Sequence, residues 1–107
     1  MPPSPPYIAR LTQEAKRDLA EIRTYTIQQF GREQWPVYQQ RIETAIQKLC
    51  QTPQLGRDVS YLALGLNRFH IGRPKGSHYL YYRLVGQYLV LVRVIHDARS
   101  PESIFRG

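Results

Sequence analysis

The sequence predicts an α+β fold in which an antiparallel pair of helices packs on a twisted antiparallel β-sheet. Two patterns predict it. In the first half of the chain, apolar residues recur every three or four positions, which is the spacing of amphipathic helices. In the second half, two stretches rich in aromatic and aliphatic residues flank a Gly-Gln pair, which is typical of a β-hairpin. A length of 107 residues allows one domain with a modest core.

The chain begins with a proline-rich lead-in and a short strand. Four prolines lie within residues 1–6, which we expect to form an extended lead-in to a single domain over residues 7–107. The alternation of apolar and polar residues in Tyr7–Leu11 predicts a short N-terminal strand.

Two helices follow. Thr12 is suited to cap the first helix and Gly31 to end it. The second helix has Pro36 in its first turn and ends before Pro53. Because so few residues join the two helices, they should run antiparallel. Charged residues mark the expected solvated face of the first helix: Glu14, Arg17, Asp18 and Glu21.

The remainder of the chain predicts strands. Residues 52–66 form a connection, and residues 74–76 and Gly86-Gln87 form turns between strands. After the last strand, Ser100 could cap one turn of helix. The expected strands are Asn67–Arg73, Ser77–Val85 and Tyr88–His96.

The hairpin loop fixes which residues share a face of the sheet, provided that no bulge interrupts the pairing. Val85 then faces Tyr88. One face carries Tyr79, Tyr81, Arg83, Val85, Tyr88, Val90, Val92, Val94 and His96. The other face carries His78, Leu80, Tyr82, Leu84, Leu89, Leu91, Arg93 and Ile95.

Both faces of this hairpin are largely apolar, unlike an antiparallel sheet with one wet side. The helices can cover one face, and the C-terminal tail, a second copy or a partner chain must cover part of the other. We expect a partner chain, because the tail has only about ten residues and uncovered apolar patches mark interaction sites. The expected partner-binding residues are Tyr79, Tyr81, Val90 and Val92.

The charge of the chain is uneven. The formal net charge is +7, of which residues 1–53 contribute +2 and residues 54–107 contribute +5. The basic second half favours an acidic partner or a phosphate backbone. The single cysteine, Cys50, excludes an internal disulfide. The sequence shows neither a bilayer-spanning apolar run nor a signal peptide, so we expect a cytoplasmic protein with no membrane partner.

Basic side chains on and beyond the predicted sheet form the candidate site: Arg68, Arg83, Arg93, His96 and Arg99. Together they could bind a phosphate or an acidic surface, whereas each alone could be a solvated arginine or be paired to Asp58 or Asp97. The three histidines, at positions 70, 78 and 96, have no cysteine or carboxylate at ligand spacing, so we expect no metal site and no cofactor.

Four segments, in this order, resemble the RelE/ParE family of bacterial type II toxins. They are "AKRDLAEIRTYTIQQFG" from Ala15, "TPQLGR" from Thr52, "GLNRFHIGR" from Gly65 and "YYRLVGQYLVLVRVIHDAR" from Tyr81. The resemblance covers about residues 7–105 and rests on the ordered set, since no single motif is specific. It implies a toxin that is neutralised by an acidic antitoxin in a hetero-oligomeric complex.

The resemblance implies two competing activities. ParE-like members inhibit DNA gyrase without a known catalytic centre, whereas RelE-like members are metal-independent endoribonucleases that cut messenger RNA on the ribosome. Metal-free RNA cleavage needs a proton shuttle and cations for the phosphate. RelE-like toxins draw on a Tyr or His near the C-terminus, but residues 97–107 contain no tyrosine, histidine or lysine. We therefore expect a ParE-like gyrase inhibitor whose target-binding residues are Arg68, Arg83, Arg93, His96 and Arg99.

Two alternatives stay open at this point. In a ribosome-dependent endoribonuclease, His96 would move the proton while Arg83 and Arg93 hold the phosphate. In a degenerate module, the chain would bind an antitoxin and have no toxic activity.

Overall fold

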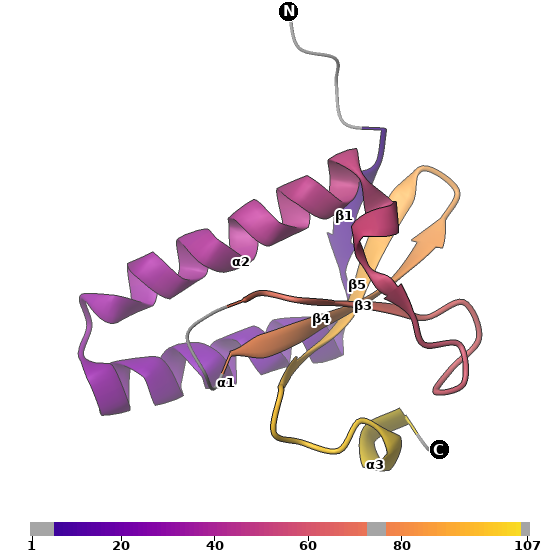
Figure 1. Ribbon diagram of the computed structural model, residues 1–107. Helices are drawn as coiled ribbons and strands as arrows, with labels where there is room; N and C mark the ends of the chain where they lie inside the picture. Colours follow the sequence, from indigo (N-terminus) through magenta and orange to yellow (C-terminus); the bar gives the residue numbers. More distant parts are fainter. Residues whose placement is uncertain (1–5, 73–76, 106–107) are drawn as a thin grey trace, which may run out of the picture.

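The computed structural model describes residues 6–72 and 77–105 of the chain (Figure 1). Of the expected proline-rich lead-in, residues 1–5 lie outside the described residues, as do Arg73 and the expected turn at residues 74–76.

The strands form one five-stranded sheet with the order β1-β5-β4-β3-β2. The expected N-terminal strand is present as β1, and it pairs parallel to β5, which makes the sheet mixed. All other pairs are antiparallel. β2 lies within the segment expected to be a connection, and it adds a two-residue edge strand. The strands are β1 Ile8–Leu11, β2 Arg57–Asp58, β3 Asn67–His70, β4 His78–Val85 and β5 Tyr88–His96.

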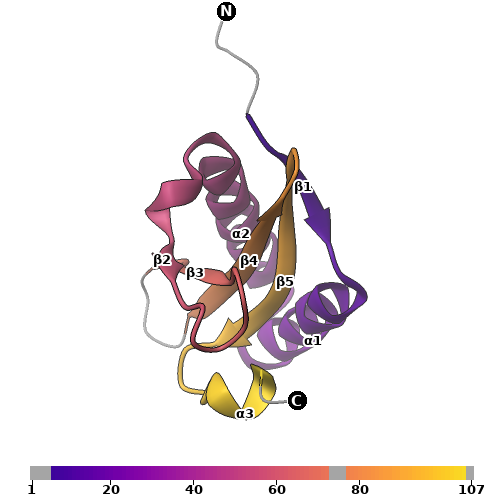
Figure 2. The same cartoon turned by 90° about the vertical axis from the view of Figure 1, so that its right-hand side faces the viewer.

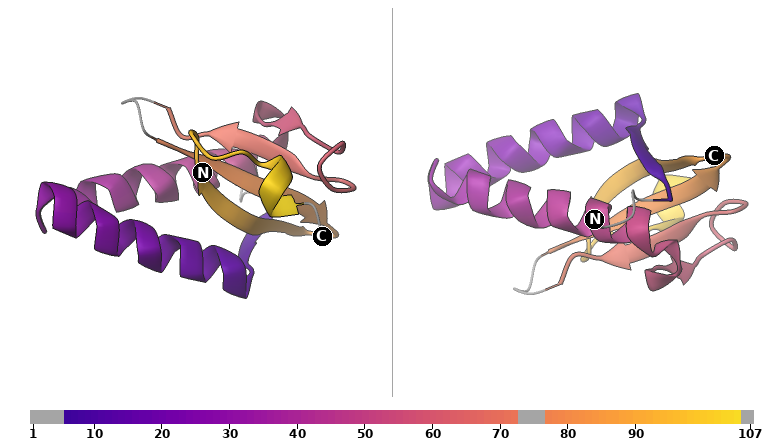
Figure 3. Two further views of the ribbon diagram at one scale, coloured as in Figure 1. Left: turned by 90° about the horizontal axis from the view of Figure 1, so that it is seen from below. Right: turned by 90° about the horizontal axis from the view of Figure 1, so that it is seen from above.

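Two long helices, α1 (Gln13–Phe30) and α2 (Gln34–Gln51), form the expected antiparallel pair. The Thr12 hydroxyl accepts a hydrogen bond from the Ala15 N–H at 3.0 Å, which is an N-cap. Gly31 ends α1 with a φ of 92°, a value that favours glycine. The joined ends of the helices extend beyond the sheet (Figures 1 and 3).

The main core lies between the helices and one face of the sheet, called here the helix face. Its largest fully buried members are Leu49, Leu80, Tyr82, Leu89 and Leu91. The short 3-10 helix η1 (Pro53–Leu55) closes one end of this core, where the Tyr82 hydroxyl donates a hydrogen bond to the Pro53 carbonyl at 2.6 Å.

A second core lies on the opposite side, called here the second face, and it includes part of the surface on which a partner chain was expected. Residues 59–66 and the terminal helix α3 (Glu102–Phe105) lie over this face (Figure 2). The Phe105 ring packs on Tyr81 with 4.9 Å between ring centroids, and Tyr81 is only 1% exposed. The tail and residues 59–66 together cover the part of this face around Tyr81 and Ile95.

A β-bulge overturns the expected division of residues between the two faces. Tyr82 pairs with Leu91 while Tyr81 pairs with Arg93, so Val92 is an extra residue in β5. Because side chains alternate along a strand, this insertion exchanges the faces of the residues that follow. Val94 packs in the main core and Ile95 packs in the second core, each opposite to the expectation.

The edge of β5 explains a second error, the expected solvation of Asp18. β1 ends opposite Leu91, so the next part of β5 pairs with β4 on one side and has no neighbouring strand on the other. There the Thr12 hydroxyl donates to the Val92 carbonyl at 2.7 Å, and the Val94 N–H donates to the Asp18 carboxylate at 2.9 Å. Asp18 is therefore only 8% exposed and completes the sheet edge.

Candidate functional site

The open part of the second face lies beside the β4–β5 hairpin, where β1 and the two hairpin strands meet (Figure 2). Ile8 and Val85 are 48% and 55% exposed there, and Arg10 is also exposed. We call this surface the open patch; its members are Ile8, Arg10, Arg83, Val85, Tyr88 and Val90. It combines apolar and cationic groups, which suits a partner that is both acidic and apolar.

Four arginines from four strands share the second face. Strand register places Arg10 beside Val90 and Arg83 on the other side of Val90, and it places Arg57 beside Arg68. The Arg68 guanidinium lies 4.2 Å from the centroid of the Tyr79 ring and donates to the Tyr81 hydroxyl at 3.4 Å. These contacts hold the Arg68 side chain in place on the sheet.

The predicted target-binding residues do not form a single cluster. Arg68 and Arg83 lie on the second face, where Arg83 donates from Nε to the Leu64 carbonyl at 2.9 Å. His96 pairs with His78, five residues along β4 from Arg83, which is roughly 17 Å away in an extended strand. Arg99 is exposed in the turn after β5.

Arg93 points away from the other predicted target-binding residues and binds α1. Its Nε donates to Asp18 Oδ2 at 2.7 Å and a terminal nitrogen donates to Asp18 Oδ1 at 3.0 Å. The two-point ion pair raises the pKa of Arg93 above its ordinary value, chiefly through the hydrogen bond to Asp18. Arg93 therefore has a structural partner, and that partner is neither Asp58 nor Asp97.

The four predicted partner-binding residues differ in access. Tyr81 is buried under α3 and the 59–66 segment, while Tyr79 and Val92 pack at the border of the same core. Val90 alone belongs to the open patch. Burial under the chain's own tail removes the Tyr81 side chain from any partner surface in this conformation.

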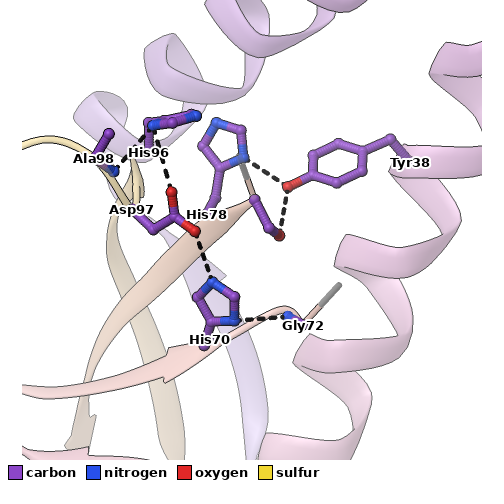
Figure 4. A network of polar contacts seen from close by, with 8 residues as sticks. Tyr38, His70, Gly72, His78, His96, Asp97 and Ala98 are labelled. Carbon is purple, nitrogen blue, oxygen red and sulfur yellow. Dashed lines mark hydrogen bonds and ion pairs between the residues drawn. The ribbon is translucent and has the colours of Figure 1, made fainter. Parts of the chain in front are cut away.

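A cluster of polar side chains surrounds the opposite end of the sheet, where three histidines come together (Figure 4). The Tyr38 hydroxyl lies 2.6 Å from His78 Nδ1 and 3.1 Å from the Ser77 hydroxyl. The rings of His78 and His96 meet edge to face with 5.3 Å between centroids. We call this group the histidine cluster; its members are Tyr38, His70, Ser77, His78, His96 and Asp97.

Hydrogen bonds determine how one of these histidines is protonated. The Gly72 N–H donates to His70 Nδ1 at 3.1 Å, so the neutral ring carries its proton on Nε2 and donates it to Asp97 Oδ2 at 3.0 Å. That bond lowers the pKa of Asp97 below its ordinary value.

Burial, together with the neighbouring His96, lowers the pKa of His78 to about 4. His78 is therefore a neutral imidazole at neutral pH.

A cavity of about 520 Å³ opens beside the histidine cluster, between the projecting ends of α1 and α2. Exposed apolar residues, Tyr25, Phe30 and Val37, line its walls, and His78 and His96 contribute to its lining. An apolar cavity with a few polar groups suits an apolar group with a hydrogen-bonding end. Within residues 6–72 and 77–105, no three His, Cys, Asp or Glu side chains come together in a way that could hold a metal ion.

Sequence reasoning placed His96 with the arginines and missed Tyr38, whose hydroxyl lies beside Nδ1 of His78, the ring that packs against His96. Tyr38 lies on α2, and no sequence signal connects it to a strand some 40 residues later. The adjacent His96-Asp97 pair was the only local hint, and the bulge in β5 concealed which face His96 occupies.

The structural arrangement agrees with comparisons to known proteins. Residues 9–101 match the family model described as the ParE toxin of the type II toxin-antitoxin system parDE. Toxin ParE1 of Caulobacter vibrioides is 34% identical over 94 residues, which are 88% of this chain and 93% of that protein. Toxin ParE1 of Mycobacterium tuberculosis H37Rv is 30% identical over 88 residues, covering 81% of this chain and 86% of that protein.

A solved structure has the same fold. The chromosomal ParDE toxin-antitoxin system from P. aeruginosa contains a chain that superposes with a TM-score of 0.72 at 19% identity, covering 87% of this chain and 98% of that one. The family model spans most of the chain, and the relatives match over nearly their whole length. The chain therefore belongs to the ParE toxin family of type II toxin-antitoxin systems.

Proposed function

We propose that this ParE-family chain inhibits DNA gyrase by binding it and that it acts without a catalytic centre of its own. The observation that supports binding over cleavage is the separation of the predicted cleavage residues. Arg83 and His96 lie at opposite ends of β4 and β5, and Arg93 is held by Asp18. The two predicted phosphate-binding arginines, Arg83 and Arg93, are therefore not placed to stabilise a phosphoryl transition state beside His96.

The target-binding residues of this proposal are those that remain available on the second face and after β5. Arg68 and Arg83 extend from the second face, and Arg99 is exposed. Arg93 is left out because its guanidinium is already bound. His96 belongs to the wall of the cavity and would contact a target only through that cavity.

We further propose that a cognate acidic antitoxin neutralises this chain by covering the open patch. Val90 lies between Arg10 and Arg83, so one partner segment can bury the valine and meet both guanidinium groups. The same contacts would block the cationic face from a target. The proposal also places the chain in the cytoplasm. Among the described residues, no helix is long and apolar enough to cross a bilayer.

One observation favours a second candidate, ribosome-dependent RNA cleavage. The rings of His78 and His96 lie edge to face beside the same cavity, so two imidazoles are available there for proton transfer. In this candidate, His96→Ala would abolish cleavage of messenger RNA on translating ribosomes. In the proposed function, the same variant retains gyrase inhibition to within a few-fold.

The test of the proposed function is a supercoiling assay with purified bacterial gyrase and antitoxin-free protein. We expect the toxin to suppress supercoiling, and Arg83→Gln to weaken the suppression. Arg17→Gln is the matched control, because it removes an exposed arginine from α1 on the opposite side of the molecule. Growth arrest on expression, reversed by the antitoxin, separates an active toxin from an inert antitoxin-binding module.

A further inference from the structure

The four arginines of the second face form two pairs, called here the arginine row, which the proposed gyrase contact does not by itself explain. Arg10 and Arg83 lie on either side of β5, two strand spacings or about 10 Å apart at their backbones. Arg57 and Arg68 are direct neighbours, about 5 Å apart. Together the four span the sheet from its first to its last strand, a width of roughly 19 Å.

The strands of the second face lack negatively charged side chains. The strand residues that share the second face with these arginines include no aspartate or glutamate. Among the described residues, none of the four arginines forms an ion pair with a carboxylate. By contrast, α1 alternates acidic and basic residues along its exposed surface. The positive field is therefore concentrated on one side of the molecule.

Two tyrosine rings on the strands of the second face, Tyr79 and Tyr88, are covered by arginines. The Arg10 guanidinium lies 4.8 Å from the Tyr88 ring centroid, and Arg68 covers Tyr79. Single-stranded nucleic acids bind such sheets by stacking bases on exposed rings. With these two ring faces occupied, the strands offer guanidinium groups to phosphates and few exposed rings to unstacked bases. That arrangement favours a duplex backbone.

We propose that the arginine row of the second face, Arg10, Arg57, Arg68 and Arg83, binds the phosphate backbone of duplex DNA directly and without sequence preference. This inference rests on the proposed function in one respect: gyrase holds duplex DNA, so a toxin bound to gyrase has that ligand beside it. The antitoxin, by covering Val90 and its flanking arginines, would compete with DNA.

The experiment measures fluorescence anisotropy of a labelled 20-base-pair duplex titrated with antitoxin-free protein between 50 and 200 mM salt. With about four phosphate contacts, we expect log K to fall against log salt with a slope of about −3.6, or roughly a hundredfold loss of affinity over this range. The double variant Arg10→Gln/Arg83→Gln should lose about half of that slope. Its affinity at 50 mM salt should fall at least tenfold.

The matched control is Arg17→Gln/Arg23→Gln, which removes the same charge from the exposed side of α1. We expect this control to stay within twofold of the wild type, and circular dichroism to show both double variants folded. Equal weakening by the two double variants, or no salt-dependent binding of the wild type at 50 mM, would overturn the inference. Tighter binding of a single-stranded RNA or DNA of the same length would overturn the choice of duplex DNA.

The outcome is distinguishable from that of the proposed function. Duplex binding with full gyrase activity would leave the arginine row as a DNA surface and refute gyrase inhibition. Gyrase inhibition without duplex binding would support the proposed function and refute the arginine row as a DNA surface.

Discussion

The pairing of Asp18 with β5 predicts that removal of one carboxylate destabilises the whole fold. Asp18→Ala removes three hydrogen bonds, two from Arg93 and one from the Val94 N–H. Loss of one partner of a buried ion pair costs about 3–5 kcal/mol. The Arg93 side chain is 24% exposed, so water relieves part of this cost. We expect the free energy of unfolding to fall by about 2–4 kcal/mol.

Urea unfolding, followed by the fluorescence of Trp35, measures this change. Trp35 is the only tryptophan and packs against the main core, so its emission reports on global unfolding. With an m value of about 1.5 kcal/mol/M, the midpoint should shift down by roughly 1.3–2.7 M. Glu43→Ala, on the exposed side of α2, is the control and should shift the free energy by less than about 0.5 kcal/mol.

A double-mutant cycle isolates the ion pair from other effects. Arg93→Ala in the Asp18→Ala background should cost much less than Arg93→Ala alone, with a coupling energy of about 1–3 kcal/mol. An Asp18→Ala midpoint within 0.3 M of the wild type would refute the reasoning. So would strictly additive costs, since they would mean that Arg93 is free to serve a target.

Three further predictions concern other parts of the fold. His78 has a pKa of about 4 when folded, against 6.5 when unfolded, so stability should fall as the pH drops from 6.5 towards 4. Partial exposure reduces the full linkage to about 1–2 kcal/mol, and urea titrations from pH 7.5 to 4.5 on the wild type and His78→Gln measure it. Gly56→Ala places a methyl group against the Tyr82 ring and should lower stability by about 1–3 kcal/mol in thermal unfolding. Phe105→Ala uncovers Tyr81 and should cost about 1–2 kcal/mol while raising binding of an apolar dye.

Each of these has a contradicting result. If the stability of His78→Gln falls with pH as steeply as that of the wild type, a group other than His78 causes the loss of stability at acid pH. An unchanged melting temperature in Gly56→Ala would mean that η1 and Tyr82 are not tightly packed. Unchanged dye binding in Phe105→Ala would mean that α3 does not cover the second face in solution.

Local signals in the sequence were enough to locate most elements. The hydroxyl of Thr12 and the glycine at position 31 delimit α1 because caps act within one turn of the helix. The loop at Gly86-Gln87 set the start of the hairpin register, and Val85 does pair with Tyr88. The resemblance to RelE/ParE toxins then supplied the family, which the comparisons support.

Features that depend on long-range contacts were not predicted. The extra residue in β5 moves every later side chain of that strand to the other face, and no local sequence pattern predicts it. Asp18 was predicted to be solvated because its helical neighbours are charged. β1 ends at Leu11, however, and leaves the Val94 N–H of β5 without a strand partner, so the Asp18 carboxylate accepts that hydrogen bond. The histidine cluster assembles from α2, β3, β4 and β5, so only the folded chain brings its members together.

The most direct test of the account is a cleavage assay in which antitoxin-free protein is titrated into purified gyrase and plasmid DNA. After protease treatment, the amount of linear DNA reports gyrase trapped on cleaved DNA. We predict that linear DNA rises with toxin, that supercoiling falls in parallel, and that His96→Ala behaves like the wild type. Intact plasmid and full supercoiling at a large excess of folded protein would contradict the account.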